Sequence, residues 1–264
     1  MIHTITVNGF PCEYVDHGSA GKPPLVLLHG WAQDHRLFRH LAPILARDFH
    51  VYALNFRGHD AQLTDVGDFT ADDLASDVIG FLDLLGLEQV RFVSTSHGCW
   101  VNIEVQDRLA DRALGKTVVI DWLMQPFPGF HTQIREGCEP ETVVAARQSL
   151  FTEWTEGTDV VDVLDHVDRE MTWFGVEMWM RACREIEKAY GHWGDPLQRM
   201  SVLADRLQVA HIYSQPLADD YRVFQEDFSR ENTWFTPVHL PGQTHFPTLE
   251  NPEGVAKAIA AFYS

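Results

Sequence analysis

Short apolar runs that alternate with helical segments constrain the fold of this chain more than any other feature. An unbroken apolar run that stops at a glycine or a polar residue is typical of a strand buried on both faces. Segments with helical periodicity, such as Leu37–Arg47 and Ala71–Leu85, separate the runs. Strands that alternate with helices predict an α/β fold in which helices flank a mostly parallel sheet. The apolar runs are Pro24–Gly30, His50–Phe56, Val90–Ser94, Thr117–Asp121, Val209–Ser214 and Thr236–Leu240.

Two further strands are indicated near the amino terminus. The β-rich runs Thr4–Val7 and Cys12–Val15 flank the dipeptide Asn8-Gly9, which favours a tight hairpin turn. With these two strands, the predicted sheet has eight.

Two helix starts are marked by the residues that precede or open them. Thr70 can cap a helix that begins at Ala71, with acidic residues in its first turn, where the helix dipole favours negative charge. Pro252 opens a last helix that is expected to end near Tyr263, because proline is favoured in a first turn.

A long segment between Asp121 and Val209 contains no convincing strand, and it far exceeds the usual connection of a few residues. We expect a helical cap at residues 126–204, inserted into an α/β core formed by residues 1–125 and 205–264. Aromatic rings in such a cap can stack on a flat aromatic ligand, and Trp154 is expected to contact the substrate. The predicted cap helices are Thr142–Glu156, Val160–Met171 and Trp173–Tyr190, and the cap tryptophans are Trp154, Trp173, Trp179 and Trp193.

The stretch STSHGCW at 94–100 follows the apolar run VRFV. A strand, a sharp turn and a helix in this order predict a nucleophile elbow, in which the central residue, here Ser96, has a strained backbone. The residues two before and two after must then be small. Gly98 meets this need, whereas Ser94 stands where glycine is usual. We therefore expect Ser96 in an active-site turn, and the motif alone leaves open whether Ser96 is a nucleophile.

Two partners for Ser96 follow other predicted strands. Because the carboxyl ends of parallel strands meet at one edge of a sheet, His245, in the loop before the last helix, is expected to reach Ser96. Asp121 directly follows its strand and is the favoured acid. Asp219 and Asp220 lie several residues beyond the next strand and are the alternative.

The loop HGW at 29–31 and the elbow together predict an anion hole. In this arrangement, the loop and the residue after the elbow serine each donate a backbone N–H. The donors would be the amides of Trp31 and His97. The Trp31 side chain is expected to form a pocket wall, and Gln33 and His35 either line the site or lie at the surface.

The charge balance excludes several classes of partner. Among 264 residues, 38 are acidic and 20 basic, which gives a net charge of −18. This argues against binding nucleic acid or an anionic membrane surface. No signal peptide or membrane-spanning run is visible, and four cysteines without a CxxC pair favour a reducing compartment. We expect a cytoplasmic monomer.

No pattern predicts a metal or dinucleotide site. The sequence has no HExxH, no HxH pair and no GxGxxG, the spacings that such sites use. His29 and His59 are expected to be structural residues of their loops.

Taken together, the motifs HGWAQDHRLF, NFRGHD, STSHGCW, VVIDWLMQPFPGF and GQTHFPTLENP resemble those of one branch of the α/β-hydrolase superfamily. That branch is the cofactor-independent ring-cleaving 2,4-dioxygenases of bacterial N-heteroaromatic degradation. The resemblance spans most of the chain. Its specific parts are S-x-S-H-G-x-W and the following I-D-W-L, whereas the HGW, RGH and histidine-loop motifs are shared with ordinary hydrolases.

The resemblance implies the α/β-hydrolase fold and a reaction without metal or organic cofactor. In that reaction, a 3-hydroxy-4-oxoquinoline and O2 give N-formylanthranilate and carbon monoxide. His245, with Asp121 fixing its tautomer, would remove the proton of the 3-hydroxyl group. Ser96 would hydrogen-bond the substrate without being acylated, and the Trp31 and His97 amides would stabilise negative charge.

Two other functions remain open at this point. From the motifs alone, the first expectation is a serine hydrolase, an esterase or C–C bond hydrolase, with a Ser96-His245-Asp121 triad. The resemblance changes that expectation to a dioxygenase. A non-catalytic receptor for an aromatic ligand is the third alternative.

Overall fold

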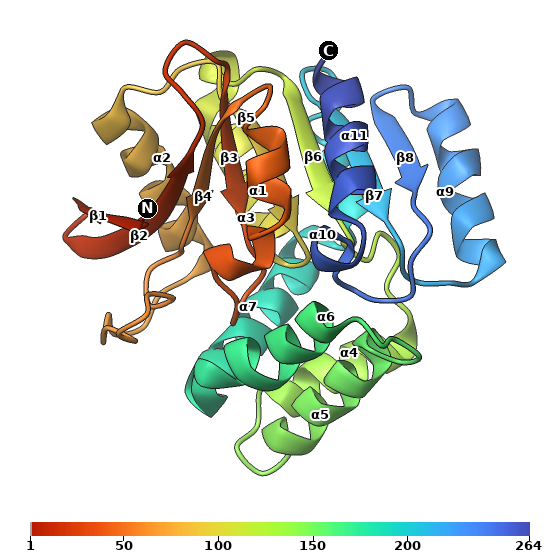
Figure 1. The fold of residues 1–264 in the computed structure, drawn as a ribbon. Coiled ribbons are helices and arrows are strands. Elements are labelled where there is room, and N and C mark those ends of the chain that lie inside the picture. Colours follow the sequence, from red (N-terminus) through yellow and green to blue (C-terminus); the bar gives the residue numbers. More distant parts are fainter. Residues whose placement is uncertain (1) are drawn as a thin grey trace.

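The computed structural model describes residues 2–264 and contains one sheet of eight strands, in the order β1-β2-β4-β3-β5-β6-β7-β8 (Figure 1). Strands β3 to β8 run parallel to one another, and β1 and β2 are antiparallel to their neighbours. The predicted mostly parallel, eight-stranded sheet is confirmed. The strands are β1 (Ile2–Val7), β2 (Phe10–His17), β3 (Pro24–Leu28), β4 (His50–Leu54), β5 (Arg91–Thr95), β6 (Lys116–Ile120), β7 (Gln208–Tyr213) and β8 (Phe235–His239).

The first two strands form the predicted hairpin. Val7 pairs with Phe10 across the turn, and Asn8 and Gly9 both have positive φ, at 50° and 88°. These are the residue types that tolerate the left-handed region at the two central positions of a tight hairpin.

Helices cover both faces of the sheet (Figure 1). Helices α1 (Leu41–Leu45) and α11 (Pro252–Tyr263) pack together on one face, and α2 (Ala71–Leu85) and α3 (Gly98–Leu109) pack together on the other. Helix α9 (Asp219–Glu231) packs beside β8 at the edge. The predicted helix at Leu37–Arg47 is instead a 3-10 turn, η1 (His35–Phe38), followed by α1.

The cap segment is helical, and its helices lie across the carboxyl ends of the strands (Figure 1). The three predicted helices are confirmed with shifted ends, whereas α4 and α8 were not predicted. One stretch, η3, is a π-helix, a form that is rare outside functional or strained positions. The helices are α4 (Pro128–Gly137), α5 (Val143–Trp154), α6 (Val161–Asp165), η3 (His166–Met171), α7 (Gly175–Trp193) and α8 (Pro196–Ser201).

Ion pairs attach the cap to the core near η1. The Arg39 guanidinium donates to the carboxylate of Glu170 at 3.0 Å and to the backbone carbonyl of Asp162 at 2.9 Å. His166 contacts the same Glu170 carboxylate at 2.6 Å. Since Arg39 is only partly exposed, these bonds are less screened than ordinary surface pairs.

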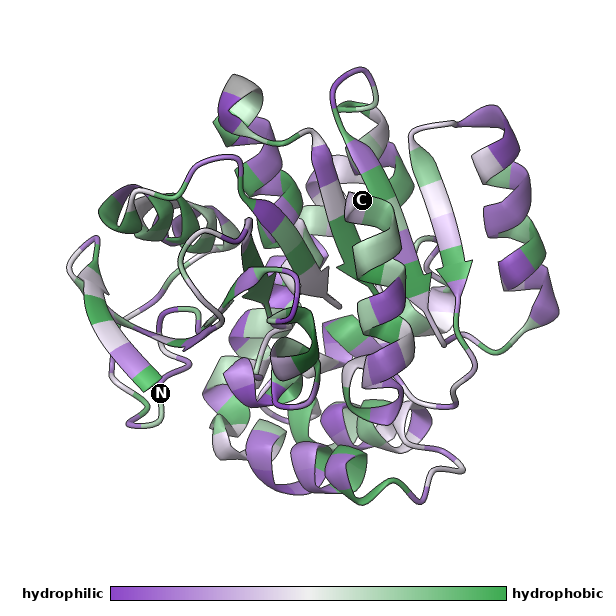
Figure 2. Cartoon of the chain, turned by 45° about the horizontal axis from the view of Figure 1, so that its top comes forward, coloured by the Kyte–Doolittle hydropathy of each residue, from purple (hydrophilic) through white to green (hydrophobic). Residues whose placement is uncertain are grey.

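The central strands form the hydrophobic core. Figure 2 shows them as mainly hydrophobic, whereas α9 and the outer faces of the cap helices are mainly hydrophilic. The four leucine and valine residues at 25–28 in β3 are fully buried, and each such side chain contributes about 1.5–3 kcal/mol on burial. Within residues 2–264, no helix combines the length and the apolar character needed to cross a membrane.

Candidate active site

The turn after β5 has the geometry of a nucleophile elbow. Ser96 has a positive φ of 50°, a conformation that non-glycine residues rarely adopt. Its N–H donates to the carbonyl of Ile120 at 2.8 Å, which ties the turn to the end of β6. A Cβ at Gly98 would lie 2.0 Å from the carbonyl oxygen of His29. Glycine is therefore required at this position, because it brings the 29–31 loop into contact with the elbow.

Ser94 replaces the usual glycine because its hydroxyl has a defined place in the core. Ser94 is fully buried, and its Oγ accepts a hydrogen bond from Asn102 Nδ2 at 2.8 Å and donates to the carbonyl of Val118 at 3.4 Å. Asn102 also donates to the hydroxyl of Thr117 at 2.8 Å. The hydroxyl links the elbow strand to α3 and β6, so the departure from glycine leaves the turn intact.

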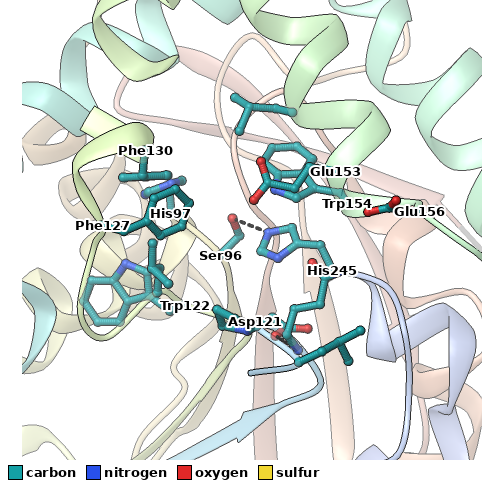
Figure 3. Close-up of a pocket in the computed structure, with 15 residues that line it drawn as sticks. Ser96, His97, Asp121, Trp122, Phe127, Phe130, Glu153, Trp154, Glu156 and His245 are labelled. Carbon is teal, nitrogen blue, oxygen red and sulfur yellow. Dashed lines mark hydrogen bonds between the residues drawn. The ribbon is translucent and has the colours of Figure 1, made fainter. Parts of the chain in front are cut away.

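Ser96 and His245 form a direct hydrogen bond. The Nε2 atom of His245 lies 3.0 Å from Ser96 Oγ (Figure 3). The His245 imidazole stacks on the indole of Trp154, with ring centroids 4.8 Å apart. The backbone N–H of His245 donates to the Trp154 carbonyl at 3.1 Å. Removal from water lowers the pKa of His245 to about 4, so the imidazole is neutral at pH 7.

Asp121 lies at the end of β6 in a second strained turn, with a φ of 43°. Its carboxylate accepts hydrogen bonds from the N–H of Gln215 at 3.1 Å, the N–H of Ser214 at 3.3 Å and the hydroxyl of Ser214 at 3.0 Å. Burial raises the pKa of Asp121 to about 7, and these hydrogen bonds partly oppose that rise. The loop after β7 thus holds the acid.

The two alternative acids lie elsewhere. Asp219 and Asp220 are exposed at the start of α9, where Asp219 pairs with Arg222 at 3.3 Å and Asp220 accepts from the N–H of Tyr221. Among residues 2–264, no direct hydrogen bond joins Asp121 to His245. Both residues nevertheless line the same cavity. The tautomer-fixing role of Asp121 therefore stays a prediction.

The expected anion hole lies between two loops in contact. Among the residues that the structure describes, neither the Trp31 N–H nor the His97 N–H has a hydrogen-bond acceptor. Ala32, with a φ of 56°, donates its N–H to Nε2 of His59 at 3.2 Å, and His29 Nε2 accepts from the N–H of Phe56 at 3.1 Å. His29 and His59 thus hold their loops in place, as predicted.

A cavity of about 240 Å³ opens between the strand ends and the cap (Figure 3). Because a cavity of about 150 Å³ can hold a benzene ring, this volume admits a fused two-ring ligand. Ser96, Asp121, His97 and His245 lie on the sheet side, and Trp154 lies on the cap side (Figure 3). The other lining residues are Trp122, Leu123, Phe127, Phe130, Leu150, Glu153, Glu156, Gln215, Pro216 and Leu217.

Three of the predicted substrate-binding side chains do not line this cavity. The Trp31 ring packs on Phe69, with centroids 5.9 Å apart. Gln33 accepts from the N–H of Gly30 at 3.2 Å. His35 is held by Asn55, whose Oδ1 accepts from the His35 N–H at 2.7 Å. The role of the Trp31 backbone amide as an anion-hole donor stays a prediction.

Of the four cap tryptophans, only Trp154 lines the cavity. Trp179 is buried among the cap helices, Trp173 is 55% exposed, and Trp193 packs against the Arg199 guanidinium at 3.9 Å. Phe130 supplies the aromatic wall that the tryptophans were expected to form, and it stacks on His97 with centroids 5.7 Å apart. Phe130 ends the motif VVIDWLMQPFPGF, but the motif alone predicts no role for it, since its position depends on how α4 packs.

Among the described residues, carboxyl groups line the cavity and no lysine or arginine does. Glu153 and Glu156 are exposed at its cap side, and His97 is neutral at pH 7 because desolvation lowers its pKa to about 3. Among residues 2–264, no group of three His, Cys, Asp or Glu side chains is placed to hold a metal ion.

Comparison with known proteins identifies related chains. A model of the alpha/beta hydrolase family matches residues 25–258. The 1H-3-hydroxy-4-oxoquinoline 2,4-dioxygenase of Pseudomonas putida is 54% identical over 261 residues, which cover 99% of this chain and 99% of that protein. A 2-heptyl-3-hydroxy-4-quinolone dioxygenase of Rhodococcus erythropolis is 37% identical over 265 residues, covering 99% of this chain and 98% of the relative.

Solved structures agree with this relationship. The structure of 1H-3-hydroxy-4-oxoquinoline 2,4-dioxygenase superposes with a TM-score of 0.97 at 54% identity and covers 99% of this chain and 100% of its own. An esterase of Thermogutta terrifontis superposes with a TM-score of 0.78 at 19% identity, covering 100% of this chain and 98% of the esterase. The esterase shares the fold alone.

Proposed function

Because the chain belongs to the alpha/beta hydrolase family and, within it, to the quinolone 2,4-dioxygenases, we propose that it cleaves the heterocyclic ring of a 1H-3-hydroxy-4-oxoquinoline with O2. The products are N-formylanthranilate and carbon monoxide. The carbon that carries the 3-hydroxyl group leaves as carbon monoxide with its own oxygen. The two atoms of O2 end in the formyl group and the carboxylate, so the atoms balance.

The proposal depends above all on one observation, the hydrogen-bonded pair of Ser96 and His245 at the wall of an aromatic cavity. A neutral imidazole at that wall can accept the proton of a bound 3-hydroxyl group. The pKa of His245 near 4 leaves it unprotonated at neutral pH. Trp154 and Phe130, on the cap side, are suited to a planar ring.

Proton removal is the step that this chain's residues must supply. O2 is a triplet and reacts slowly with closed-shell molecules, whereas a delocalised anion can transfer one electron to it. The resulting radical pair can then form a C–O bond. His245 takes the proton, and Ser96 donates a hydrogen bond to the substrate oxygen and orients the ring without becoming acylated.

Asp121 supports the base after proton transfer. A carboxylate close to the imidazole stabilises the imidazolium and so raises the basicity of His245. Because burial raises the pKa of Asp121 to about 7, the carboxyl is charged only above that pH. Ser214 and Gln215 fix its position.

The proposed anion hole, formed by the Trp31 and His97 amides, acts after proton removal, when negative charge lies on the substrate. The N–H groups of Trp31 and His97 have no acceptor among residues 2–264. Preorganised donors stabilise negative charge as it develops. In the proposed reaction, that charge lies on a substrate or peroxide oxygen.

A serine hydrolase is the second candidate, because Ser96 has the elbow conformation and a histidine partner. An acyl-enzyme on Ser96 would then form during turnover. Rapid labelling of Ser96 by a fluorophosphonate, together with ester cleavage, would favour it.

Measurement of gases tests the proposal directly. Purified protein, freed of iron, copper and flavin, is incubated with 1H-3-hydroxy-4-oxoquinoline in the presence and absence of air. We expect uptake of one O2 and release of one carbon monoxide for each substrate consumed, and no turnover without O2. Substrate loss under nitrogen, or O2 uptake without carbon monoxide, would contradict the reaction. The cytoplasmic location and the monomeric state stay predictions.

A further inference from the structure

A second, much smaller cavity lies beside the Ser96–His245 pair. Its volume is about 10 Å³, and Ser96 and His245 line both this cavity and the large one. The hydrogen-bonded pair therefore lies between the two spaces. The other residues around the small cavity are Gln33, Leu37, Thr95, Ile120, Phe246, Pro247 and Thr248.

Two threonine residues that line this small cavity have side-chain hydroxyls without a hydrogen-bond partner among residues 2–264. They are Thr95 and Thr248, which are 5% and 1% exposed. Buried hydroxyl groups are almost always hydrogen-bonded in native proteins, to protein or to ordered water. A buried hydroxyl without a partner is costly.

Gln33 supplies a third polar group at the same place. Its Oε1 accepts from the N–H of Gly30 at 3.2 Å, and its Nε2 has only a 3.9 Å contact with the sulfur of Met171. One amide N–H of Gln33 therefore remains to donate. Three residues that line the small cavity thus each carry a polar group that is free to hydrogen-bond one small molecule there.

We propose that this cavity is a binding site for one structural water molecule, held by Thr95, Thr248 and Gln33. A buried water needs about one probe sphere of space, roughly 10–15 Å³, and two to four polar partners, and the cavity supplies both. The alternative occupant, O2, does not fit this site as well. It forms no comparable hydrogen bonds with these groups, and the pair of Ser96 and His245 would separate an O2 molecule here from a substrate ring in the large cavity.

The water joins three segments that form the active site. Thr95 is the last residue of β5, directly before Ser96, and Thr248 lies in α10 (Pro247–Glu250), directly after the His245 loop. Gln33 lies in the loop that follows the Trp31 amide. Hydrogen bonds from one water to all three would fix the distance between the elbow and the base. This inference does not depend on the identity of the reaction.

High-resolution crystal structures of the wild type and of the Thr95→Val/Thr248→Val double variant test the site. We expect a water oxygen within about 2.7–3.2 Å of both hydroxyls in the wild type and none in the double variant. The matched control, Thr95→Ser/Thr248→Ser, keeps both hydroxyls and should keep the water. An unoccupied site in the wild type, or xenon binding there under pressure without loss of a water, would overturn the proposal.

Thermal stability gives a second readout. If the hydroxyls bind water, their replacement by methyl groups removes real hydrogen bonds, and the melting temperature of the double valine variant should fall by roughly 2–4 °C. If the hydroxyls have no partner, the same replacement leaves the melting temperature unchanged or raises it, and the proposal is wrong. Neither readout uses the reaction, so failure here leaves the proposed function standing.

Discussion

The two walls of the large cavity are built in different ways. On the sheet side, Ser96 and Asp121 both have positive φ angles and sit directly after buried parallel strands. Backbone hydrogen bonds from β6 and β7 hold these turns. On the cap side, Trp154, Glu153 and Glu156 come from the end of one helix and the turn that follows it, and are partly or fully exposed.

This difference assigns the reacting groups to the sheet side and the choice of ligand to the cap side. A strained backbone persists only where the surrounding structure determines it, so the sheet side can keep reacting groups at fixed distances. The cap side presents side chains from helices whose surroundings are less constrained. We infer that substitutions on the sheet side change the rate, whereas substitutions on the cap side change which molecules bind and leave.

The largest expected effect is that of His245→Ala. Because the His245 imidazole is the group hydrogen-bonded to Ser96 at the cavity wall, we expect turnover of 1H-3-hydroxy-4-oxoquinoline to fall by about 10³-fold or more, toward the upper end of general-base contributions. His192→Ala, at an exposed position in the cap, is the matched control and should leave the rate unchanged. A His245→Ala enzyme with full activity would remove the base from the mechanism.

The second effect concerns Asp121 and pH. Its pKa is raised to about 7, whereas that of His245 is lowered to about 4. His245 is therefore neutral near pH 7, whereas the Asp121 carboxylate, which supports it in the proposed mechanism, becomes protonated as the pH falls below 7. We expect kcat/KM to be highest above pH 7 and to decline up to tenfold per unit below it. Asp121→Asn should lower kcat/KM by about 10²-fold at pH 8 and abolish this decline; the same profile in the variant would contradict the assignment.

The same carboxyl should destabilise the fold at high pH. Its folded pKa lies above the unfolded value of 3.8, so its contribution to stability is complete below about pH 4 and is lost as the pH rises through 7. The loss is about 4 kcal/mol at most, for a shift of about three units. Thermal melts should therefore show Asp121→Asn gaining on the wild type between pH 5 and 8. If the melting temperatures of Asp121→Asn and the wild type differed by the same amount at pH 5 and pH 8, this effect of the Asp121 carboxyl on stability would be ruled out.

Ser96→Ala separates the two chemistries. In the dioxygenase, Ser96 only orients the substrate, so we expect kcat to fall by roughly 10- to 100-fold and activity to remain measurable. In a serine hydrolase, loss of the nucleophile would cost about 10⁶-fold. Steady-state assay of substrate consumption decides between them, and a complete loss of activity would favour the hydrolase alternative.

The smallest effect is expected on the cap side. The proposed product, N-formylanthranilate, carries a carboxylate, whereas the substrate is neutral. In the part of the chain that the structure describes, Glu153 and Glu156 line the cavity and no lysine or arginine does. Removing both charges with Glu153→Gln/Glu156→Gln should strengthen product inhibition by roughly two- to fivefold at low salt, with less effect at high salt. Glu141→Gln, exposed on the cap but outside the cavity, is the control. Equal inhibition constants in all three proteins would show that these charges do not act on the product.

The starts of two helices could be predicted to the residue because local sequence signals mark them. Helix α2 begins after Thr70, where a capping box with Asp73 fixes the start. Helix α11 begins at Pro252. Helix α9 was not predicted, although Tyr221, Phe224 and Phe228 recur at helical spacing and pack against the core as an apolar stripe.

The site was predictable where the fold itself brings residues together. Ser96, Asp121 and His245 follow strands that end at the same edge of the sheet, and the structure places all three at one cavity. Of the cap residues of that cavity, Trp154 was predicted. The others were not predictable, because tertiary packing of α4 and α5 decides which side chains point inward. Gln33 and His35 were expected near the site, but hydrogen bonds to Gly30 and Asn55 direct them away from the large cavity.

The order of the site residues along the chain has a consequence for biosynthesis. The elbow, the acid and the cap are all made before the loop after β8 that carries His245. A ribosome-bound nascent chain that stops short of this loop lacks the proposed base. If His245 is that base, such a chain is catalytically silent until residue 245 has been made and has reached Ser96.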